Sequence, residues 1–232
     1  MSVMPIKTNV VLLGPPGCGK GTQAFYLAER FSLYKLSTGD LIRKEIDSNS
    51  ARGNQMKQIV NAGGFTSDDI ILGLIREKIE TLLSQEKGII FDGVPRTLNQ
   101  AKELDKILIS KNSSLDSVIE LKVTDNALIE RILGRYTCAK CDEGYNDIYR
   151  NPQKEGVCDK CGSIEFKRRK DDTKEIIQNR LDVYRNETEP LLSYYDAKGI
   201  LTSVDGLLPI EEVSQALEAI LLKGAVKDKI FG

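Results

Sequence analysis

The sequence has no histidine and no tryptophan, and aromatic residues make up only 6% of its 232 residues. Without histidine, the chain cannot use a Ser-His-Asp or Cys-His nucleophile, a histidine general base or a histidine metal ligand. Any reaction that it catalyses should therefore depend on positioning and charge, and phosphoryl transfer fits that description.

Neither sign of charge is in excess, because 33 Lys and Arg residues face 34 Asp and Glu residues, for a net charge of -1. A near-neutral chain argues against a dedicated nucleic-acid-binding protein. No apolar run approaches the ~18 residues that a membrane helix needs. The apolar stretch 10–13 is also too short for a signal-peptide core. We therefore expect a soluble, cytoplasmic protein with reduced thiols and with no nucleic-acid or membrane partner.

Short apolar segments alternate with amphipathic ones along most of the chain. Strands are predicted at residues 9–13, 34–37, 88–91, 118–123 and 200–204. Apolar residues at positions 24, 27, 28 and 31 follow the spacing of a helix face, and a last helix is predicted from residue 210. This alternation predicts an α/β fold in which helices cover both faces of a parallel sheet.

A glycine-rich loop at residues 14–22, the phosphate loop, joins the first predicted strand to the first helix. In such loops, consecutive backbone N–H groups and the helix N-terminus bind phosphate, and Lys20 can reach the β- and γ-phosphates. The pattern G-x-x-x-x-G-K-[ST] fails at one position, because Gly21 takes the hydroxyl position and Thr22 follows it. We interpret Cys18 as a small loop residue without a redox function.

Four cysteines form two pairs, Cys138-x-x-Cys141 and Cys158-x-x-Cys161, separated by sixteen residues. This spacing is typical of a zinc site in which four thiolates form a tetrahedron. Disulfides are disfavoured in a reducing compartment, while an iron–sulfur cluster is compatible with the spacing. Four protein ligands leave no open position, so the metal should be structural and replace a core that a short segment cannot build.

The form Gly-x-Pro-Gly-x-Gly-Lys-Gly-Thr of the phosphate loop resembles that of nucleoside monophosphate kinases, and of adenylate kinases in particular. The resemblance extends along nearly the whole chain, in the family's order: Ser37-Thr38-Gly39-Asp40 with Arg43, Phe91-Asp92-Gly93-Val94-Pro95-Arg96-Thr97 with Gln100, and Arg169-Lys170-Asp171-Asp172 with Arg180. Val94 replaces the aromatic residue of the family's D-G-[FY]-P-R motif, and Phe65 and Thr66 replace aliphatic residues.

The resemblance implies reversible, magnesium-dependent phosphoryl transfer from ATP to AMP, giving two ADP, by a monomer that maintains the adenine nucleotide balance. It implies a P-loop kinase core at 1–37, 71–135 and 173–232. A helical AMP-binding insertion would occupy 38–70, and a small, β-rich, zinc-containing segment, the lid, would occupy 136–172.

The resemblance also implies the residues of each site. Those for ATP are Gly17, Cys18, Gly19, Lys20, Gly21, Thr22, Arg131, Arg135 and Leu208. Those for AMP are Thr38, Gly39, Arg43, Gly64, Phe65, Thr66, Gly93, Arg96, Gln100, Arg169 and Arg180. The catalytic set is Lys20, Asp92, Arg96, Arg131, Arg135, Arg169 and Arg180, with Asp92 holding magnesium through water.

Several of these residues also have ordinary structural interpretations. Asp40 is a reasonable N-cap for a helix that begins at Leu41, and Asp171 and Asp172 could cap the helix that follows them. Arg131 and Arg135 are one helical turn apart, so without context they would form a solvated basic face. The resemblance instead directs the arginines to the phosphates, whose geometry guanidinium groups match, and makes the two aspartates their partners in lid closure.

Three other functions compete with this interpretation. The nearest is a sister kinase of the same build that uses GTP as donor or UMP or CMP as acceptor. The second is a zinc-ribbon, nucleic-acid-binding ATPase, which would need a basic surface and aromatic platforms for the bases. The third is a nucleotide sensor without catalysis, which the retained Lys20, Asp92 and arginine set argue against.

Overall fold

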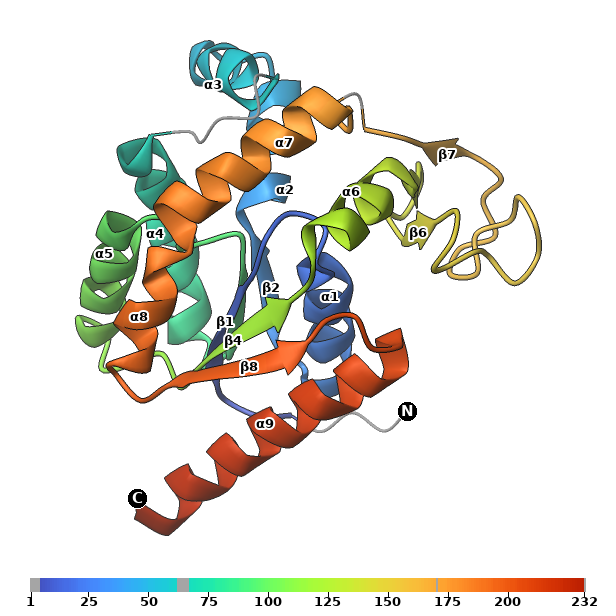
Figure 1. Cartoon of the computed structure of the whole chain (residues 1–232). Helices are drawn as coiled ribbons and strands as arrows, with labels where there is room; N and C mark the ends of the chain where they lie inside the picture. Colours follow the sequence, from blue (N-terminus) through green and yellow to red (C-terminus); the bar gives the residue numbers. More distant parts are fainter. Residues whose placement is uncertain (1–4, 62–66, 170, 232) are drawn as a thin grey trace.

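The apolar strands predicted from the sequence form one central sheet in the computed structural model, which describes residues 5–61, 67–169 and 171–231 (Figure 1). The strands are β1 (Asn9–Leu13), β2 (Tyr34–Ser37), β3 (Ile89–Asp92), β4 (Ser117–Lys122), β5 (Arg135–Cys138), β6 (Gly144–Asn146), β7 (Phe166–Lys167) and β8 (Leu201–Asp205). The helices are α1 (Lys20–Phe31), α2 (Thr38–Asp47), α3 (Ala51–Asn61), α4 (Asp68–Ser84), α5 (Leu98–Ile109), α6 (Asp125–Leu133), α7 (Lys174–Val183), the π-helical turn η1 (Tyr184–Thr188), α8 (Pro190–Asp196) and α9 (Ile210–Phe231).

The central sheet has the strand order β2-β3-β1-β4-β8, and every neighbouring pair is parallel. The predicted α/β fold with a parallel sheet flanked by helices is therefore confirmed. Each predicted strand is present, although β3, β4 and β8 are each shifted from their predicted bounds by one residue at both ends.

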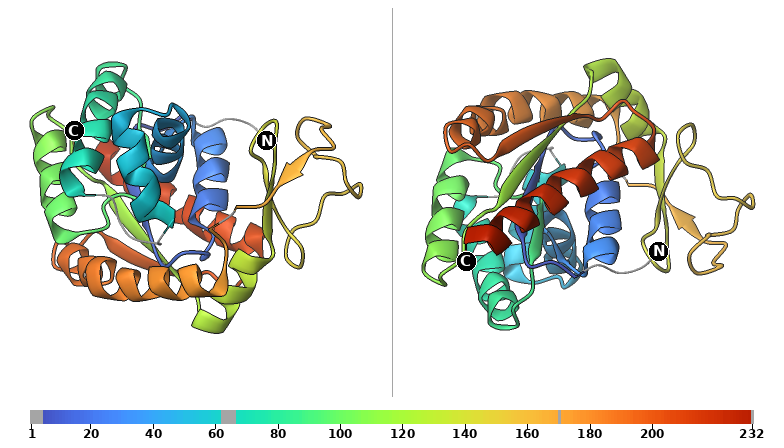
Figure 2. Two further views of the ribbon diagram at one scale, coloured as in Figure 1. Left: turned by 90° about the horizontal axis from the view of Figure 1, so that it is seen from above. Right: turned by 90° about the horizontal axis from the view of Figure 1, so that it is seen from below.

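Helices cover both faces of the sheet (Figure 2). Alternate residues of the strands build two hydrophobic clusters, one on each face. Val11 and Leu13 of β1 belong to the cluster that contains α4, α5 and α8. Val10 and Leu12 belong to the cluster that contains α1, α6, α7 and α9. Successive side chains of a strand point to opposite faces of the sheet, and both faces are buried here. The strands are therefore continuous apolar runs in the sequence.

The helices of the 38–70 segment share the first of these clusters. Ile42 of α2 and Met56 of α3 are buried with Ile71 and Ile75 of α4. At Gly53 a Cβ would lie 2.2 Å from the Glu45 carbonyl oxygen, so α2 and α3 approach too closely for any side chain there. The segment is therefore packed into the main core and has no separate cluster of its own among the described residues.

The lid contains a second, antiparallel sheet of order β6-β5-β7. Its small core consists of Cys138, Tyr145 and Cys158, against which Tyr136 and Phe166 pack. The three aromatic rings lie with centroids 5.5–5.7 Å apart. The described part of the lid thus has a core built from its own residues.

Two predicted helix caps are wrong. Helix α2 begins at Thr38, and its N-cap is Ser37, whose hydroxyl accepts a hydrogen bond from the Asp40 N–H at 3.3 Å. Asp40 therefore lies in the first turn and does not cap the helix. Thr173 is the N-cap of α7, in place of Asp171 or Asp172. Over the ranges that the structure describes, no helix is long and apolar enough to cross a membrane.

Candidate active site

The phosphate loop lies at the edge of the sheet where the parallel strands end. Gly14, Gly17 and Gly19 have φ angles of 139°, 84° and 103°, which L-residues rarely adopt. A Cβ on Gly14 would lie 2.7 Å from the Leu121 carbonyl oxygen, and one on Gly17 would lie 2.7 Å from Cγ1 of Ile132. Glycine at both positions lets the loop curl against β4 and α6, with its N–H groups at the start of α1.

Lys20 lies within this loop. Its Nζ donates hydrogen bonds to the carbonyl oxygens of Gly14 at 2.6 Å and Pro15 at 2.9 Å, and it lies 3.5 Å from Cys18 Sγ. The Cys18 side chain is itself buried. The ammonium group is thus held at the loop, where it can meet a bound phosphate after a short movement of a flexible side chain.

Asp92 ends β3 next to the phosphate loop. Its Oδ2 lies 3.8 Å from Lys35 Nζ and 3.8 Å from the position that a Cβ on Gly21 would take. Carboxylate oxygens are ligands of magnesium, directly or through water, and this carboxylate lies beside the start of α1. Asp92 therefore fits a magnesium ion bound with nucleotide phosphates on this loop.

Arginines from separate parts of the chain converge near this edge, and we call them the arginine cluster: Arg43, Arg96, Arg135, Arg169 and Arg180. Burial lowers the pKa of Arg96 to about 10, against the opposing effect of Asp92, and the charges of Arg180 and Arg43 lower it further. Burial also lowers the pKa of Arg169 to about 10, with Arg135 and Arg43 adding to the effect. Like charges gathered and partly desolvated in this way favour binding of a polyanion.

The two aspartates of the lid's C-terminal end pair with members of the cluster. Asp172 accepts two hydrogen bonds from Arg135, at 3.0 Å from Nε and 2.5 Å from Nη2, and lies 3.9 Å from Arg180. Asp171 forms an ion pair with Arg180. Burial raises the pKa of Asp171, but Arg180 outweighs it and holds that pKa below its usual value. The aspartates thus orient the guanidinium groups of Arg135, at the start of β5, and of Arg180 in α7.

Arg131 and Arg135 do not share a helix face as predicted. Gly134 ends α6, so Arg135 is the first residue of β5. Arg131 donates a hydrogen bond to the Gly206 carbonyl oxygen at 2.8 Å, and its guanidinium lies 5.2 Å from the centre of the Tyr149 ring. Sequence reasoning missed Tyr149, whose only signal was an aromatic residue in a polar segment. Leu208 lies exposed in the turn after β8.

The residues predicted for AMP lie near the end of β3. The Thr38 hydroxyl and Arg96 Nε each donate a hydrogen bond to the Gly93 carbonyl oxygen, both at 2.8 Å. The buried Gln100 side chain accepts from the Arg96 N–H at 2.8 Å and donates to Asp68 at 2.7 Å. Sequence reasoning also missed Asp68, which holds Gln100 from the start of α4. Gly39 is in α2, and the predicted Gly64, Phe65 and Thr66 lie outside the described residues.

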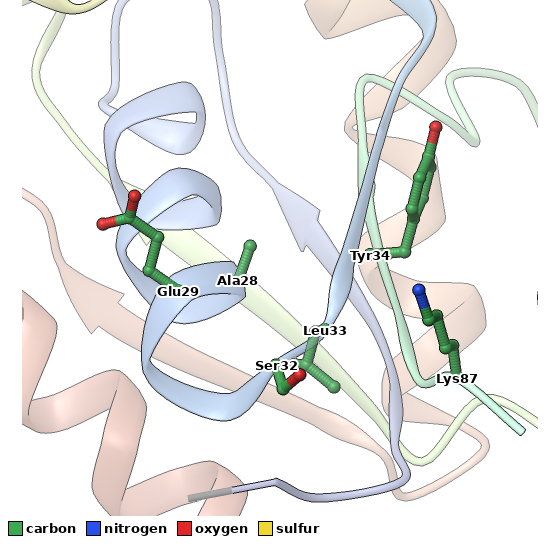
Figure 3. A pocket seen from close by; sticks show the side chains of 6 residues that line it. All are labelled: Ala28, Glu29, Ser32, Leu33, Tyr34 and Lys87. Carbon is green, nitrogen blue, oxygen red and sulfur yellow. The ribbon is translucent and has the colours of Figure 1, made fainter. Parts of the chain in front are cut away.

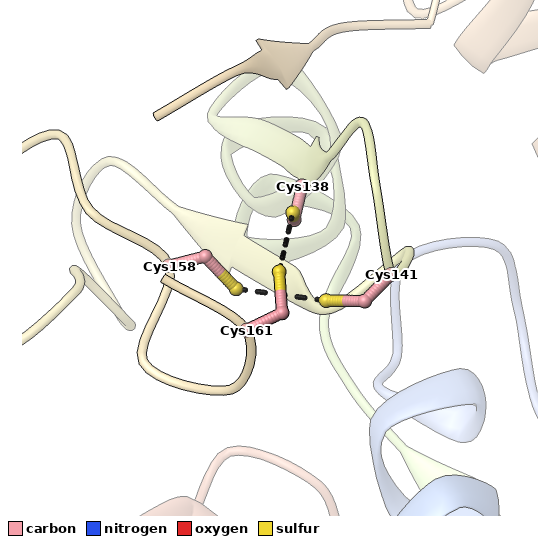
Figure 4. A group of neighbouring side chains, drawn as sticks. All are labelled: Cys138, Cys141, Cys158 and Cys161. Carbon is pink, nitrogen blue, oxygen red and sulfur yellow. Dashed lines mark hydrogen bonds between the residues drawn. The ribbon is translucent and has the colours of Figure 1, made fainter. Parts of the chain in front are cut away.

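The four cysteines of the lid come together as predicted (Figure 4). All four Sγ atoms lie within 4.8 Å of one another, with Cys138 3.5 Å from Cys161 and Cys141 3.6 Å from Cys158. A tetrahedral zinc ion with Zn–S bonds of ~2.3 Å would require sulfur separations of about 3.8 Å. The four free thiols therefore fit a tetrahedral metal ion.

Each cysteine pair forms the same turn. In the first knuckle, residues 138–143, the Cys138 carbonyl accepts from the Asp142 N–H at 3.1 Å; in the second, residues 158–163, the Cys158 carbonyl accepts from the Gly162 N–H at 2.8 Å. The φ angles of Asp142 and Gly162 are both left-handed, at 58° and 71°. Backbone N–H groups of Lys140 and Lys160 point to the first sulfur of their own knuckle. Such N–H···S bonds stabilise thiolate ligands.

A separate pocket of about 310 Å³ lies at the other end of α1 (Figure 3). It is lined by Ala28, Glu29, Ser32, Leu33, Tyr34 and Lys87. None of these residues belongs to the predicted sites, and the pocket takes no part in the arrangement described above.

Comparison with known proteins identifies the family. The family model "Adenylate kinase" matches residues 12–200, from within β1 to the residue before β8. The chain belongs to the adenylate kinase family. Among curated adenylate kinases, that of Rhizorhabdus wittichii is 49% identical over 92% of this chain and 99% of its own length. Those of Novosphingobium aromaticivorans (48%) and Paramagnetospirillum magneticum (49%) match over 92% of this chain and 98% of their own lengths.

Proposed function

We propose that the chain transfers a phosphoryl group from ATP to AMP, reversibly and with magnesium, giving two ADP. The observation that carries this proposal is that the arginine cluster lies at the edge of the central sheet where the phosphate loop also lies. Charge spreads over the equatorial oxygens of the transferred group, and several guanidinium forks can stabilise that charge together. The names of the curated relatives support adenylate kinase activity.

The two nucleotides would occupy opposite sides of this edge. We assign ATP to the phosphate loop, where Lys20 would contact its phosphates. The planar guanidinium of Arg131 and the ring of Tyr149 would contact its base. We assign AMP to the side formed by Thr38, Arg96 and Gln100. The attacking group is the phosphate of AMP, which is already ionised, so no protein base is needed.

The metals have separate roles in this proposal. Magnesium neutralises phosphate charge when bound with ATP, and Asp92 would hold it. Zinc would be bound by Cys138, Cys141, Cys158 and Cys161, and with no open coordination position it would be structural. The zinc-stabilised lid, residues 136–172, would exclude water from the site while its arginines are in place.

We further propose a cytoplasmic monomer that keeps adenine nucleotides in balance and that has no nucleic-acid or membrane partner. Its core would be 1–37, 71–135 and 173–232, and residues 38–70 would form the AMP-binding insertion. These properties are typical of the adenylate kinase family.

The test is a coupled assay of ADP formation from ATP, magnesium and AMP, with UMP, CMP and GMP run in parallel. A strong preference for AMP is the expected result. A preference for another acceptor would keep the phosphoryl-transfer chemistry but assign the chain to a sister specificity. Absence of turnover with all four acceptors would refute a kinase function.

A further inference from the structure

The second knuckle of the lid contacts the helix that follows the phosphate loop. Lys160 Nζ lies 3.3 Å from Oε1 of Glu29 and 3.8 Å from the centre of the Phe25 ring. Phe25 and Glu29 are one turn apart on α1, so both present to the same side of the helix. A single lysine thus joins the lid to α1 by an ion pair and a cation–π contact.

Other contacts between the lid and the core lie at the two ends of the lid: Asp171 and Asp172 pair with Arg180 of α7, and the remaining contacts are with α6 and the residue that ends it. The Asn146 side chain and the Asp147 N–H donate to carbonyl oxygens of Arg131 and Gly134, at 2.8 and 2.9 Å. The Tyr149 hydroxyl donates to Glu130 at 2.7 Å. These contacts fix where the lid is attached, whereas Lys160, in the second knuckle, contacts a different element, α1.

The two knuckles provide an internal comparison. Lys140 occupies in the first knuckle the place that Lys160 occupies in the second, and each donates its backbone N–H to a cysteine sulfur. Within the described residues, the Lys140 side chain is exposed and forms no ion pair or ring contact. The core contact of Lys160 is therefore not a requirement of the metal-binding turn.

We propose that Lys160 is a positioning residue, which docks the lid on α1 through Phe25 and Glu29 and so favours the arrangement in which Arg135 and Arg169 face the phosphate loop. The proposal rests on the proposed function, because Arg135, directly before the lid, and Arg169, within it, belong to that site. If a nucleotide binds only when the lid is docked, its apparent affinity is the intrinsic affinity multiplied by the fraction of molecules in which the lid is docked. A smaller docked fraction therefore weakens binding.

The size of the effect follows from exposure. The side chains of Lys160 and Glu29 are 40% and 66% exposed, so water and salt screen the ion pair. The cation–π contact adds a comparable small contribution. Together they should shift the docking equilibrium by about fivefold, and less at high salt.

The experiment compares Lys160→Ala with Lys140→Ala in the metal-loaded full-length protein. We expect Lys160→Ala to raise the KM for ATP, by up to about fivefold, with kcat not lowered, because saturating nucleotide restores docking. Lys140→Ala should match the wild type, and Lys160→Arg should restore the wild-type KM. Metal content and melting temperature of each variant establish that the knuckle is intact.

Two further measurements decide the mechanism. In a double-mutant cycle, Glu29→Ala should have little effect once Lys160 is alanine, whereas additive effects would overturn the proposal. Amide hydrogen exchange of residues 152–163 without nucleotide should be faster in Lys160→Ala and unchanged in Lys140→Ala. Equal kinetics and equal exchange in the two variants would refute docking by Lys160. An inactive wild type would refute the proposed function alone, because the exchange comparison needs no activity.

Discussion

At the scale of single residues, the proposed function assigns to the arginines what a histidine-free chain needs for phosphoryl transfer. Burial lowers the pKa of Arg96 and Arg169 only to about 10, so both remain charged at neutral pH. A lysine in the same surroundings would start from a lower pKa and would present one charge centre instead of a planar fork. Permanent positive charge is therefore compatible with substantial burial at this edge of the sheet.

Lys20 allows the most direct test of the phosphate loop. Lys20→Met should lower kcat at least about a thousandfold, because it removes a cation placed on the transferred phosphates. The fold should remain, since methionine keeps the aliphatic part of the side chain. The coupled ADP assay and a thermal melt measure both properties. Lys87→Met, at the distant pocket, is the matched control, and full activity of Lys20→Met would refute the assignment of the loop.

Asp171 should make stability depend on pH in the acid range. Arg180 holds the pKa of this carboxyl below 3.8 in the folded protein. Ionised Asp171 therefore stabilises the folded state at every pH above the pKa that the carboxyl has in the unfolded chain. The contribution is lost as pH falls through the lower, folded pKa. The difference in melting temperature between wild type and Asp171→Asn should therefore be constant from pH 7 to about 5 and shrink below about pH 4.

The control for this prediction is Asp182→Asn, which makes the same change in charge at an exposed pair with Arg185. It should alter the melting temperature little at any pH. A difference for Asp171→Asn that stayed the same at pH 3 and pH 7 would contradict the role of its ionised form.

At the scale of helices and strands, periodicity predicted the existence and type of the core elements. Buried β-strands such as Asn9–Leu13 are recognisable because both of their faces are apolar. Helix ends were less predictable, since the cap depends on where the strand before it stops. Ser37 remains extended and Thr38 is already helical, so the cap lies three residues before Asp40.

Side-chain partners were the least predictable feature of the site. The four-cysteine centre could be predicted because local spacing fixes its geometry. Arg135 was misplaced because Gly134 ends a helix that the i, i+4 spacing appeared to continue. Asp68 and Tyr149 reach site residues only through the tertiary fold, and no local pattern of charge or periodicity marks them. The location of the phosphate loop, by contrast, needed only the strand before it and the helix after it.

Loss of the proposed metal centre at the four cysteines should have the most visible effect on stability. Cys138→Ser should release metal and lower the melting temperature by about 5–10 °C, since the lid core consists of the cysteines and three aromatic rings. Activity at low temperature should fall only modestly, because the metal has no open position for substrate. Metal analysis and calorimetry measure the effect. Cys18→Ser, at the cysteine outside the cluster, should keep its metal; an unchanged melting temperature for Cys138→Ser would contradict a structural metal.

At the scale of the whole molecule, the site exists only when distant segments are brought together. Residues separated by more than a hundred positions, such as Arg43 and Arg180, meet at the edge where the strands end. Ligands that bridge these segments should therefore stabilise the entire fold and not one part of it.

Nucleotides should raise the melting temperature of the intact protein. At one hundred times its dissociation constant, ATP with magnesium or AMP should each add about 2.7 kcal/mol of stability. For a chain of this size that corresponds to a shift of roughly 5–10 °C. Differential scanning fluorimetry over a series of nucleotide concentrations measures it. A shift with UMP at concentrations where AMP has none would contradict the assignment of the acceptor.

The separate core of the lid has a consequence for the evolution and engineering of this chain. Its cysteines and aromatic rings contact one another, whereas Ile42 and Met56 of the other insertion are buried together with residues of the main sheet. A unit with its own interior can be exchanged as a cassette, since replacing it opens no cavity elsewhere. Transplanting residues 136–172 between relatives should therefore be tolerated, while recombination within 38–61 would demand compensating changes across the interior. Natural diversity in metal use can then accumulate in the lid without disturbing the rest of the enzyme.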